Sequence, residues 1–272
     1  MFKFITLFLI SLSVFAQAPG KTESDLLKQE AESLWAKRDN QETLEEMLSK
    51  LEAAYEANKE DREVLERLSR GYFLLGDHHL TNKDLMLRAY EKGREWGLKG
   101  MNLNKEFKDR LKSKSIKNSV DKLTDADVPS MYWTLANTGK WSKLNGIFSS
   151  LKYKDEILAL LGRVEELRPN YFYSAVPCYW GGFYALAPGI AGGSMDKSKK
   201  KFKESMEKSP EYLGTKVLYA ETYLVKKKDK KEFEKVLKEV ISSDLGPAEL
   251  HPENKLEKKK AERLLENKDE IF

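Results

Sequence analysis

Aromatic side chains are concentrated in one segment, residues 169–193, with the sequence PNYFYSAVPCYWGGFYALAPGIAGG. Seven of these 25 residues are aromatic, against 11% for the whole chain, so the enrichment is local. Aromatics beside glycines can line an apolar cavity, in which the polar tips of Tyr and Trp orient a ligand. Because aromatics at helical spacing also fill ordinary cores, core packing stays the alternative for each of them.

A second aromatic segment, MYWTLANTGKW at residues 131–141, is predicted to form the opposite wall of that cavity. In a helix, offsets of three and four place Trp180 with Phe183 and Tyr184, so the aromatics of residues 179–184 cannot all face one side. One subset can therefore pack in the core while the rest faces a cleft. The candidate ligand-binding or partner-binding residues are Tyr132, Trp133, Trp141, Tyr171, Tyr173, Tyr179, Trp180, Tyr184, Gly192 and Gly193.

Gly192 and Gly193 end the aromatic segment and resemble a phosphate-binding loop only superficially. No strand is predicted before them and no Gly-Lys-Ser/Thr follows, so a nucleotide site is not indicated. Glycines at this point can instead end one helix and allow the next to pack closely.

The other chemistry-bearing residues form no catalytic or metal-binding set. His78 and His79 are adjacent, so in a helix their side chains point about 100° apart and do not share a metal; we expect a surface pair near a helix end. His251 is expected in a turn. No G-x-S-x-G, H-E-x-x-H or P-loop motif occurs, and paired acids lie among many exposed charges. The sequence therefore predicts that the protein is not an enzyme and that it binds neither a metal nor a cofactor.

The cysteine content and the net charge exclude an intramolecular disulfide and argue against nucleic acid as a partner. The single cysteine, Cys178, excludes an intramolecular disulfide and is predicted to be a small buried apolar side chain and not a reactive thiol. The chain has 48 Lys and Arg against 44 Asp and Glu, and this small positive excess is spread out, so nucleic acid is not an expected partner. Lysine runs at 199–201 and 226–228 are predicted to be solvated helix faces, with anionic lipid or an acidic partner as the alternative.

Helical periodicity dominates the elements that must position the aromatic segments. Apolar residues recur at i, i+3, i+4, i+7 and i+8 across residues 233–241, and a similar stripe runs through residues 44–55. Helix starts are predicted after Asn40, at Ser209-Pro210-Glu211 and at His251-Pro252-Glu253, because capping residues, an early Pro and acids favour a first turn. We expect about a dozen helices, joined by short turns into antiparallel hairpins.

Partial matches to the tetratricopeptide pattern occur three times along the chain. The matching residues are Leu68, Ser69, Tyr72, Ala89, Gly93, Gly97, Ser198, Phe202, Ser205, Pro210, Tyr219, Ala220 and Tyr223. The predicted fold is therefore all-α, with tetratricopeptide-like helical hairpin repeats forming an α-solenoid. Residues 21–272 are predicted to be a single helical-repeat domain, with a sub-boundary in the polar, weakly patterned residues 105–128.

The first residues have the pattern of a cleavable export signal. A basic start is followed by an apolar stretch, residues 4–12, that is too short to span a bilayer. Small residues fit cleavage after Ala16 or Ala18, so residues 1–16 are predicted to be a signal peptide, with a buried N-terminal helix as the alternative. No later stretch is long and apolar enough to span a membrane. No cysteine follows the apolar stretch, so the lipid attachment of a bacterial lipoprotein is not predicted.

Several ordered motifs resemble one known family, the T component associated with TRAP transporters (the TatT family). The similarity runs from about Leu26 to the end of the chain. The motifs that carry it are Tyr132-Trp133 with Gly139-Lys140-Trp141, Pro169-Asn170-Tyr171, Gly181-Gly182-Phe183-Tyr184, Pro188, Gly192-Gly193, Lys199 with Phe202 and Pro210, Leu218-Tyr219-Ala220, Ala261-Glu262-Arg263-Leu264-Leu265 and Ile271-Phe272.

This resemblance implies a periplasmic helical-repeat protein that partners the solute-binding subunit of a TRAP-type system. It also implies assembly as a homotrimer and an apolar channel or cleft for a hydrophobic or organic-acid small molecule. The chain departs from many similar proteins in lacking a cysteine at the cleavage site, so membrane anchoring is not implied, although export is. The alternative is a generic exported tetratricopeptide scaffold for protein–protein interaction, without a small-molecule role.

Overall fold

The structure is a computed structural model and describes residues 22–272. It is built of helices joined by short turns and, over the described residues, contains no β-strand, which confirms the all-α class. The predicted signal peptide, with its cleavage after Ala16 or Ala18, lies outside the described residues. No helix in the described part of the chain is long and apolar enough to cross a membrane.

The first half of the chain contributes α1 (Glu23–Trp35), α2 (Gln41–Ala57), α3 (Arg62–Leu74), the π-helical turn η1 (Leu75–His79), α4 (Lys83–Met101), α5 (Lys105–Leu111) and the 3-10 turns η2 (Val120–Lys122) and η3 (Asp125–Asp127). The second half contributes α6 (Val128–Asn145), α7 (Ile147–Leu167), α8 (Tyr171–Leu186), η4 (Gly189–Ala191), α9 (Met195–Lys208), α10 (Gly214–Tyr219), η5 (Ala220–Leu224), α11 (Val225–Lys227), α12 (Lys230–Ser242), η6 (Ala248–Leu250), α13 (His251–Glu266) and α14 (Lys268–Ile271).

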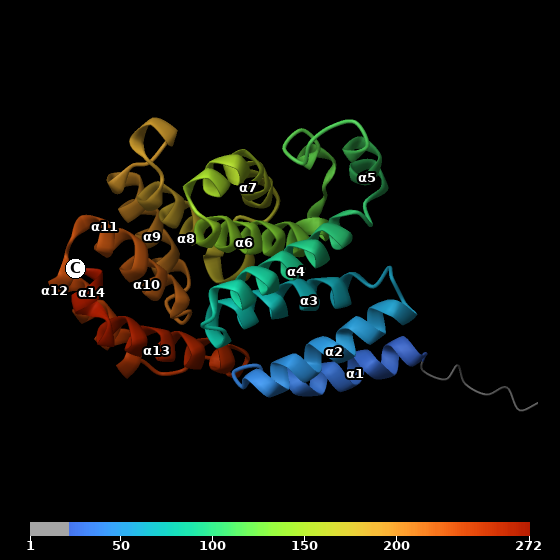
Figure 1. The fold of residues 1–272 in the computed structure, drawn as a ribbon, viewed down its shortest axis with the longest axis horizontal. Helices are drawn as coiled ribbons and strands as arrows, with labels where there is room; N and C mark the ends of the chain where they lie inside the picture. The colour runs from blue at the N-terminus through green and yellow to red at the C-terminus, as the bar shows by residue number, and fades with distance from the viewer. Residues whose placement is uncertain (1–21) are drawn as a thin grey trace, which may run out of the picture.

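Consecutive helices pack against each other as hairpins. The closest pairs include α1 with α2, α3 with α4, α6 with α7, α8 with α9 and α12 with α13. Figure 1 shows the chain passing from the α1–α2 hairpin through α3, α4 and α6, then coming back so that α13 begins beside the α1–α2 turn and runs from there to the C-terminus at the left. Stacked hairpins are what the sequence led us to expect, but the tetratricopeptide-like solenoid itself stays a prediction.

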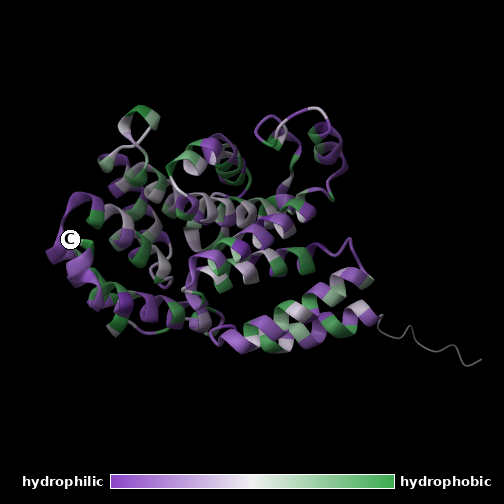
Figure 2. Ribbon diagram, in the orientation of Figure 1, coloured by the Kyte–Doolittle hydropathy of each residue, from purple (hydrophilic) through white to green (hydrophobic). Residues whose placement is uncertain are grey.

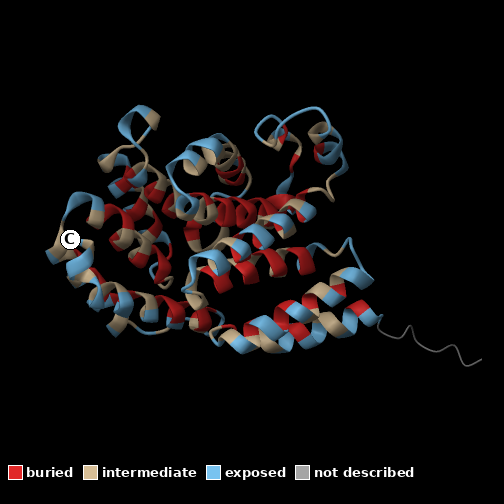
Figure 3. Cartoon of the chain, viewed as in Figure 1, coloured by how far each residue is buried: buried red, intermediate tan, exposed pale blue. Residues whose placement is uncertain are grey.

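Helix α6 lies at the centre, and its residues are buried on nearly every side (Figure 3). Its close approach to α4 is possible because glycines of α4 face it. A Cβ added to Gly97 would lie 2.2 Å from Thr134 Oγ1, and one added to Gly93 would lie 2.3 Å from Asn137 Oδ1. Both glycines are among the residues that match the tetratricopeptide pattern. Side chains at these two positions would push α4 away from α6, so the close packing of this pair depends on them.

Two of the three predicted helix starts are confirmed. Asn40 is the N-cap of α2 and accepts a hydrogen bond from the backbone N–H of Thr43, and α13 begins at His251 with Pro252 in its first turn. The predicted start at Ser209-Pro210-Glu211 is wrong, because these residues form the turn between α9 and α10, which begins at Gly214. Ser209 is the C-cap of α9, where its backbone N–H donates to the Ser205 carbonyl.

Three apolar clusters fill the interior. One lies among α1 to α4, one around α6, α7 and the beginning of α8, and one among α8, α9, α10, α12 and α13. The helices that enclose them are two-faced in Figure 2, with hydrophobic and hydrophilic residues on different sides. Burial of these apolar stripes is the main force that holds the hairpins together.

Residues 105–128, where a sub-boundary was predicted, connect α4 to α6 and contain α5, η2 and η3. Asp127 anchors it from a fully buried position. Its carboxylate accepts hydrogen bonds from the Thr124 backbone N–H at 2.8 Å and from Asn104 Nδ2 at 2.8 Å, and it pairs with Arg62 at 2.6 Å. A sub-boundary between two halves at this connection stays a prediction.

Candidate functional site

The predicted aromatic segment enters α8 through a strained turn. Phe172, Tyr173 and Ser174 have φ values of +47°, +52° and +57°, a left-handed conformation that non-glycine residues rarely adopt. Each such residue costs about 1–3 kcal/mol, so the surroundings must enforce the turn. Ser205 Oγ donates to the Ser174 carbonyl at 2.8 Å, and the hydroxyls of Ser174 and Ser209 lie 3.1 Å apart.

This turn places the first aromatics of the segment against α6. The ring of Phe172 lies 4.9 Å from that of Trp133, and the ring of Tyr171 lies 5.3 Å from that of Tyr132. Tyr173 stacks instead on Tyr212, with centroids 5.7 Å apart and planes 16° from parallel. The structure therefore brings the two predicted aromatic segments together through their N-terminal parts.

Farther along α8 the aromatics separate into two sets. Tyr179 faces α6, where its hydroxyl donates to the Leu135 carbonyl at 3.0 Å. Trp180 stacks on Tyr184 at 5.6 Å and donates its indole N–H to Glu165 Oε2 of α7 at 2.9 Å. Neither Trp180 nor Tyr184 borders the cavity described next.

A cavity of about 460 Å³ lies between α6, α7 and α8, and residues of α10, η5 and α13 line its inner end. Its volume is within the range of small-molecule sites. Three of the ten candidate residues, Tyr132, Trp133 and Tyr179, contribute to its wall. The rest of the wall is mostly apolar and includes Phe73, Ala136, Phe172, Ala175, Phe183 and Leu218.

The other candidate residues lie around this cavity and not in its wall. Tyr171 and Tyr173 belong to the ring cluster behind it, and Trp141 packs on Tyr153 at 5.7 Å. Gly192 adopts a φ of +96°, and a Cβ on Gly193 would lie 1.8 Å from the Ala187 carbonyl oxygen. These glycines allow the tight η4 loop.

The outer end of the cavity is bordered by exposed apolar side chains. Ile147 and Leu151 of α7 and Leu186 of α8 line the cavity and are about half exposed. Phe148 is 86% exposed beside them, and Ile190 is fully exposed on the η4 loop, which projects from the molecule between α8 and α9 (Figure 1). We call these five residues the apolar rim. Grouped exposed apolar side chains of this kind mark interaction surfaces.

The inner end of the cavity carries charged groups that sequence reasoning missed. Asp77 of η1 pairs with Lys140 of α6 and lies 3.3 Å from Nζ of Lys260 of α13. Lys260 also lies 3.0 Å from Oε2 of Glu221 in η5. All four residues border the cavity. Burial opposes ionisation of Asp77, but Lys140 and Lys260 hold its pKa well below the usual range.

Two further titratable groups complete this charged cluster. Burial raises the pKa of Glu257 to about 7, and burial lowers the pKa of His78 to about 3. His78 Nε2 lies 3.6 Å from Glu257 Oε1 and 3.5 Å from Asp77 Oδ2. The predicted surface pair of histidines is wrong for His78, whose side chain is only 3% exposed because η1 turns it inward. His79 is partly exposed, and its Nε2 lies 3.1 Å from the Arg38 carbonyl.

Two other features of the chain agree with the sequence. Cys178 is buried, as predicted, and burial raises the pKa of its thiol to about 12. Lys199, Lys200 and residues 226–228 are mostly exposed, as expected for solvated helix faces.

Within residues 22–272 no cluster of three His, Cys, Asp or Glu side chains is arranged to hold a metal ion.

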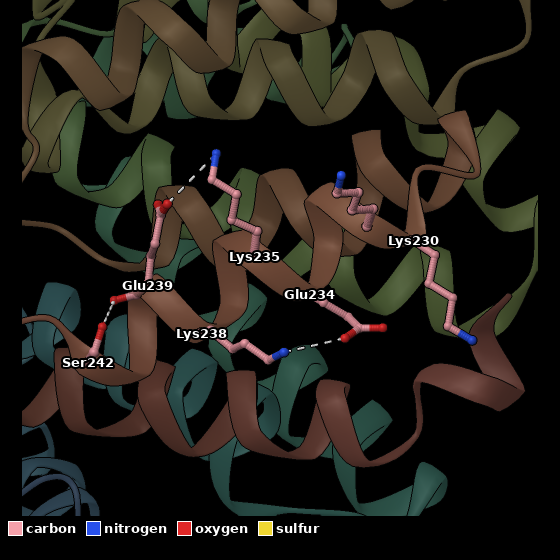
Figure 4. A pocket seen from close by; sticks show the side chains of 7 residues that line it. Lys230, Glu234, Lys235, Lys238, Glu239 and Ser242 are labelled. Atoms are coloured by element: carbon pink, nitrogen blue, oxygen red, sulfur yellow. Dashed lines mark hydrogen bonds and ion pairs between the residues drawn. The ribbon is translucent and has the colours of Figure 1, made fainter.

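A second surface depression lies on α12 and is of a different kind. Its lining comes from one exposed helix face, with Lys238 3.5 Å from Glu234, and Lys235 4.0 Å from Glu239 (Figure 4). These i,i+4 pairs are solvent-exposed and contribute little to stability. The depression has no apolar wall that could hold a ligand, so the cavity between α6 and α8 is the stronger candidate.

Comparison with known proteins agrees with this architecture. The family model of the TRAP transporter T-component matches residues 27–272, nearly the whole described chain. The protein belongs to the TRAP transporter T-component family. No curated protein matched the chain. The resemblance found in the motifs is confirmed, and it identifies the chain as an accessory component of a transport system.

Proposed function

We propose that this T component works in the periplasm, where it docks the solute-binding subunit of a TRAP-type transporter and holds a small ligand in its cavity. The apolar rim is the docking surface, and the cavity behind it receives the apolar body of the ligand. Removal of the predicted signal peptide after Ala16 or Ala18 delivers the protein to that compartment. The protein acts by binding and not by catalysis.

The observation that carries this proposal is the position of the apolar rim at the outer end of the cavity. Ile147, Leu151 and Leu186 belong to both features, so a partner that covers the rim also covers the opening. Burial of exposed apolar side chains is the main source of affinity at the centre of a protein interface. A solute-binding subunit docked here would exchange ligand with the cavity without exposing its apolar part to water.

A generic exported scaffold is the second candidate. In that case the rim would bind a protein, and the cavity would be an incidental gap in the packing. The two candidates differ in one measurable respect, since only the first predicts that the purified chain binds small apolar ligands saturably. The tetratricopeptide-like repeat and the homotrimer implied by the family are compatible with either, and light scattering tests the trimer.

The docking proposal is tested by calorimetry with the cognate solute-binding protein. The double variant Phe148→Ser, Ile190→Ser removes two strongly exposed rim residues that contribute little to the folded core, so the protein should keep its melting temperature. We expect its affinity to fall about tenfold or more, as is typical for central apolar contacts. Leu26→Ser on α1, where the side chain is 50% exposed and distant from the rim in the chain, is the control. Unchanged affinity in the double variant would exclude the rim as the docking surface.

A further inference from the structure

The two buried lysines at the inner end of the cavity are balanced by two carboxylates, without a contribution from Glu257. Lys140 and Lys260 are matched by Asp77 and Glu221, and the two lysines contact these two carboxylates directly. The contact between Lys143 and Glu221, at 3.4 Å, adds a solvent-facing cation. A ligand that brought a carboxylate to this end would find both buried lysines already paired.

Glu257 is the remaining acid of the cluster and takes no part in these lysine–carboxylate contacts. Its side chain is 8% exposed, it borders the cavity, and among residues 22–272 nothing hydrogen-bonds to its Oε2. Its contact with a basic side chain in the described chain is His78 Nε2 at 3.6 Å, longer than a hydrogen bond. An unsatisfied carboxyl oxygen at this depth costs free energy, so it is a place where a polar ligand atom is favoured.

A glycine makes room for this carboxyl group beside the cavity. A Cβ added to Gly214 would lie 2.8 Å from Glu257 Oε1 and 2.8 Å from the Tyr212 hydroxyl. Both Tyr212 and Glu257 border the cavity. The hydroxyl and the carboxyl group therefore converge at the inner end, where each can donate or accept a hydrogen bond when Glu257 is protonated.

We propose that the inner end of the cavity binds the uncharged polar head of an amphiphile, a hydroxyl or an amide, through the Glu257 carboxyl group, and discriminates against carboxylates. This inference rests on the proposed ligand-binding function of the cavity and names the class of ligand. The apolar wall takes the hydrocarbon body, and Glu257 fixes the orientation of the head. The cluster selects against a further negative charge beside the two ionised carboxylates, Asp77 and Glu221.

A neutral head also fits better than a cationic one. Lys140 and Lys260 both border the cavity, so an ammonium head at the inner end would lie beside two cations of the protein. The raised pKa of Glu257 means that this carboxyl group takes up a proton near neutral pH and does not require a counter-ion. Bringing a new ion pair into a buried site costs desolvation of both charges, whereas a neutral head needs only one hydrogen bond.

Matched ligands with one alkyl chain and three heads test the proposal. Titration of decanol, decanoate and decylammonium into the full chain is followed by calorimetry near pH 7. We expect decanol to bind about tenfold more tightly than either charged ligand, the effect of one hydrogen bond together with the avoided burial of a charge. If decanoate or decylammonium binds more tightly than decanol, the assignment of a neutral head group is overturned, although the cavity would still be a ligand site.

Variants at Glu257 assign the effect to that residue. Glu257→Gln keeps a donor and an acceptor in the same place, so decanol affinity should change by less than about threefold. Glu257→Leu removes the partner and should weaken decanol by about fivefold or more, while melting curves confirm that both variants fold. Equal decanol affinity in the Gln and Leu variants overturns the role of Glu257. Failure of all three ligands to bind the unmodified chain contradicts the proposed function itself.

Discussion

The ion pair between Arg38 and Glu253 gives the sharpest prediction about the fold. Arg38 follows α1 and Glu253 lies in the first turn of α13, so the contact joins the α1–α2 turn to the beginning of α13, 215 residues later in the chain. Their side chains are 3% and 2% exposed. Arg38 Nε donates to Glu253 Oε1 at 2.8 Å, and Arg70 donates to the same oxygen at 2.6 Å. The Arg70 guanidinium also lies over the ring of Phe172, at 4.7 Å.

Glu253→Ala removes one acceptor and leaves two buried guanidinium groups without their carboxylate. Loss of one partner of a buried ion pair costs about 3–5 kcal/mol, because the remaining charge is uncompensated. For a chain of this size each kcal/mol shifts the melting temperature by roughly 2–4 °C, so the expected loss is roughly 6 °C or more. Urea denaturation followed by circular dichroism gives the free energy of unfolding directly.

The matched control is an exposed pair between the same two parts of the chain. Lys255 Nζ lies 3.3 Å from Asp39 Oδ2, and the lysine side chain is 47% exposed. Lys255→Ala should therefore cost no more than about 1 kcal/mol, since exposed pairs are weak. A cost for Glu253→Ala below about 1 kcal/mol, or equal to that of the control, would refute the argument from burial.

Three more predictions follow from single residues. Gly93→Ala places a methyl group against Asn137 and should lower the free energy of unfolding by about 1–3 kcal/mol. Gly162→Ala in α7, with open space around it, should raise it by up to about 1 kcal/mol, and urea denaturation of both variants measures the two changes. The raised pKa of Glu257 favours folding of the protonated form, so its contribution is full below about pH 4.5 and is lost as pH rises through about 7. Glu257→Gln should therefore gain stability over the unmodified protein on going from acid to about pH 8, by an amount on the order of 3 kcal/mol, and a constant difference would contradict this. Cys178 is 7% exposed and borders the cavity, so a thiol reagent too bulky to enter the cavity should label it only as fast as the chain opens, and rapid labelling by such a reagent would contradict this burial.

Local patterns in the sequence predicted the all-α class and the position of several helices, because apolar periodicity and capping residues act within one element. The stripe from Phe233 and the cap at Asn40 both lie where they were expected. The start predicted at Ser209 was wrong, because a Pro after a Ser also suits a turn that leaves a helix. The left-handed turn that begins at Phe172 had no signal in the sequence, since tertiary packing imposes it on residues that disfavour it.

The cavity was only partly predictable. Tyr132 and Tyr179 were identified because aromatics are rare enough for a local excess to be visible. The charged cluster was not, because Asp77, Lys140 and Lys260 are far apart in sequence and residues of these types are usually exposed. Only the packing of η1, α6 and α13 brings them together, and that packing depends on the whole fold.

The central claim is that the space between α6 and α8 binds an apolar ligand. Gly182 borders this cavity, and a Cβ there would meet only Leu218 Cδ2, at 3.6 Å, so a leucine at this position would extend into the open space. Gly162→Leu in α7, which does not border the cavity and has nothing within 4 Å, is the matched control.

The decisive measurement is fluorescence titration of the neutral apolar dye N-phenylnaphthylamine with the unmodified protein and these two variants. We predict saturable binding of one dye per chain to the unmodified protein and to Gly162→Leu, and loss of that binding in Gly182→Leu with its melting temperature retained. Equal binding by all three proteins, or no saturable binding by the unmodified protein, would contradict the account.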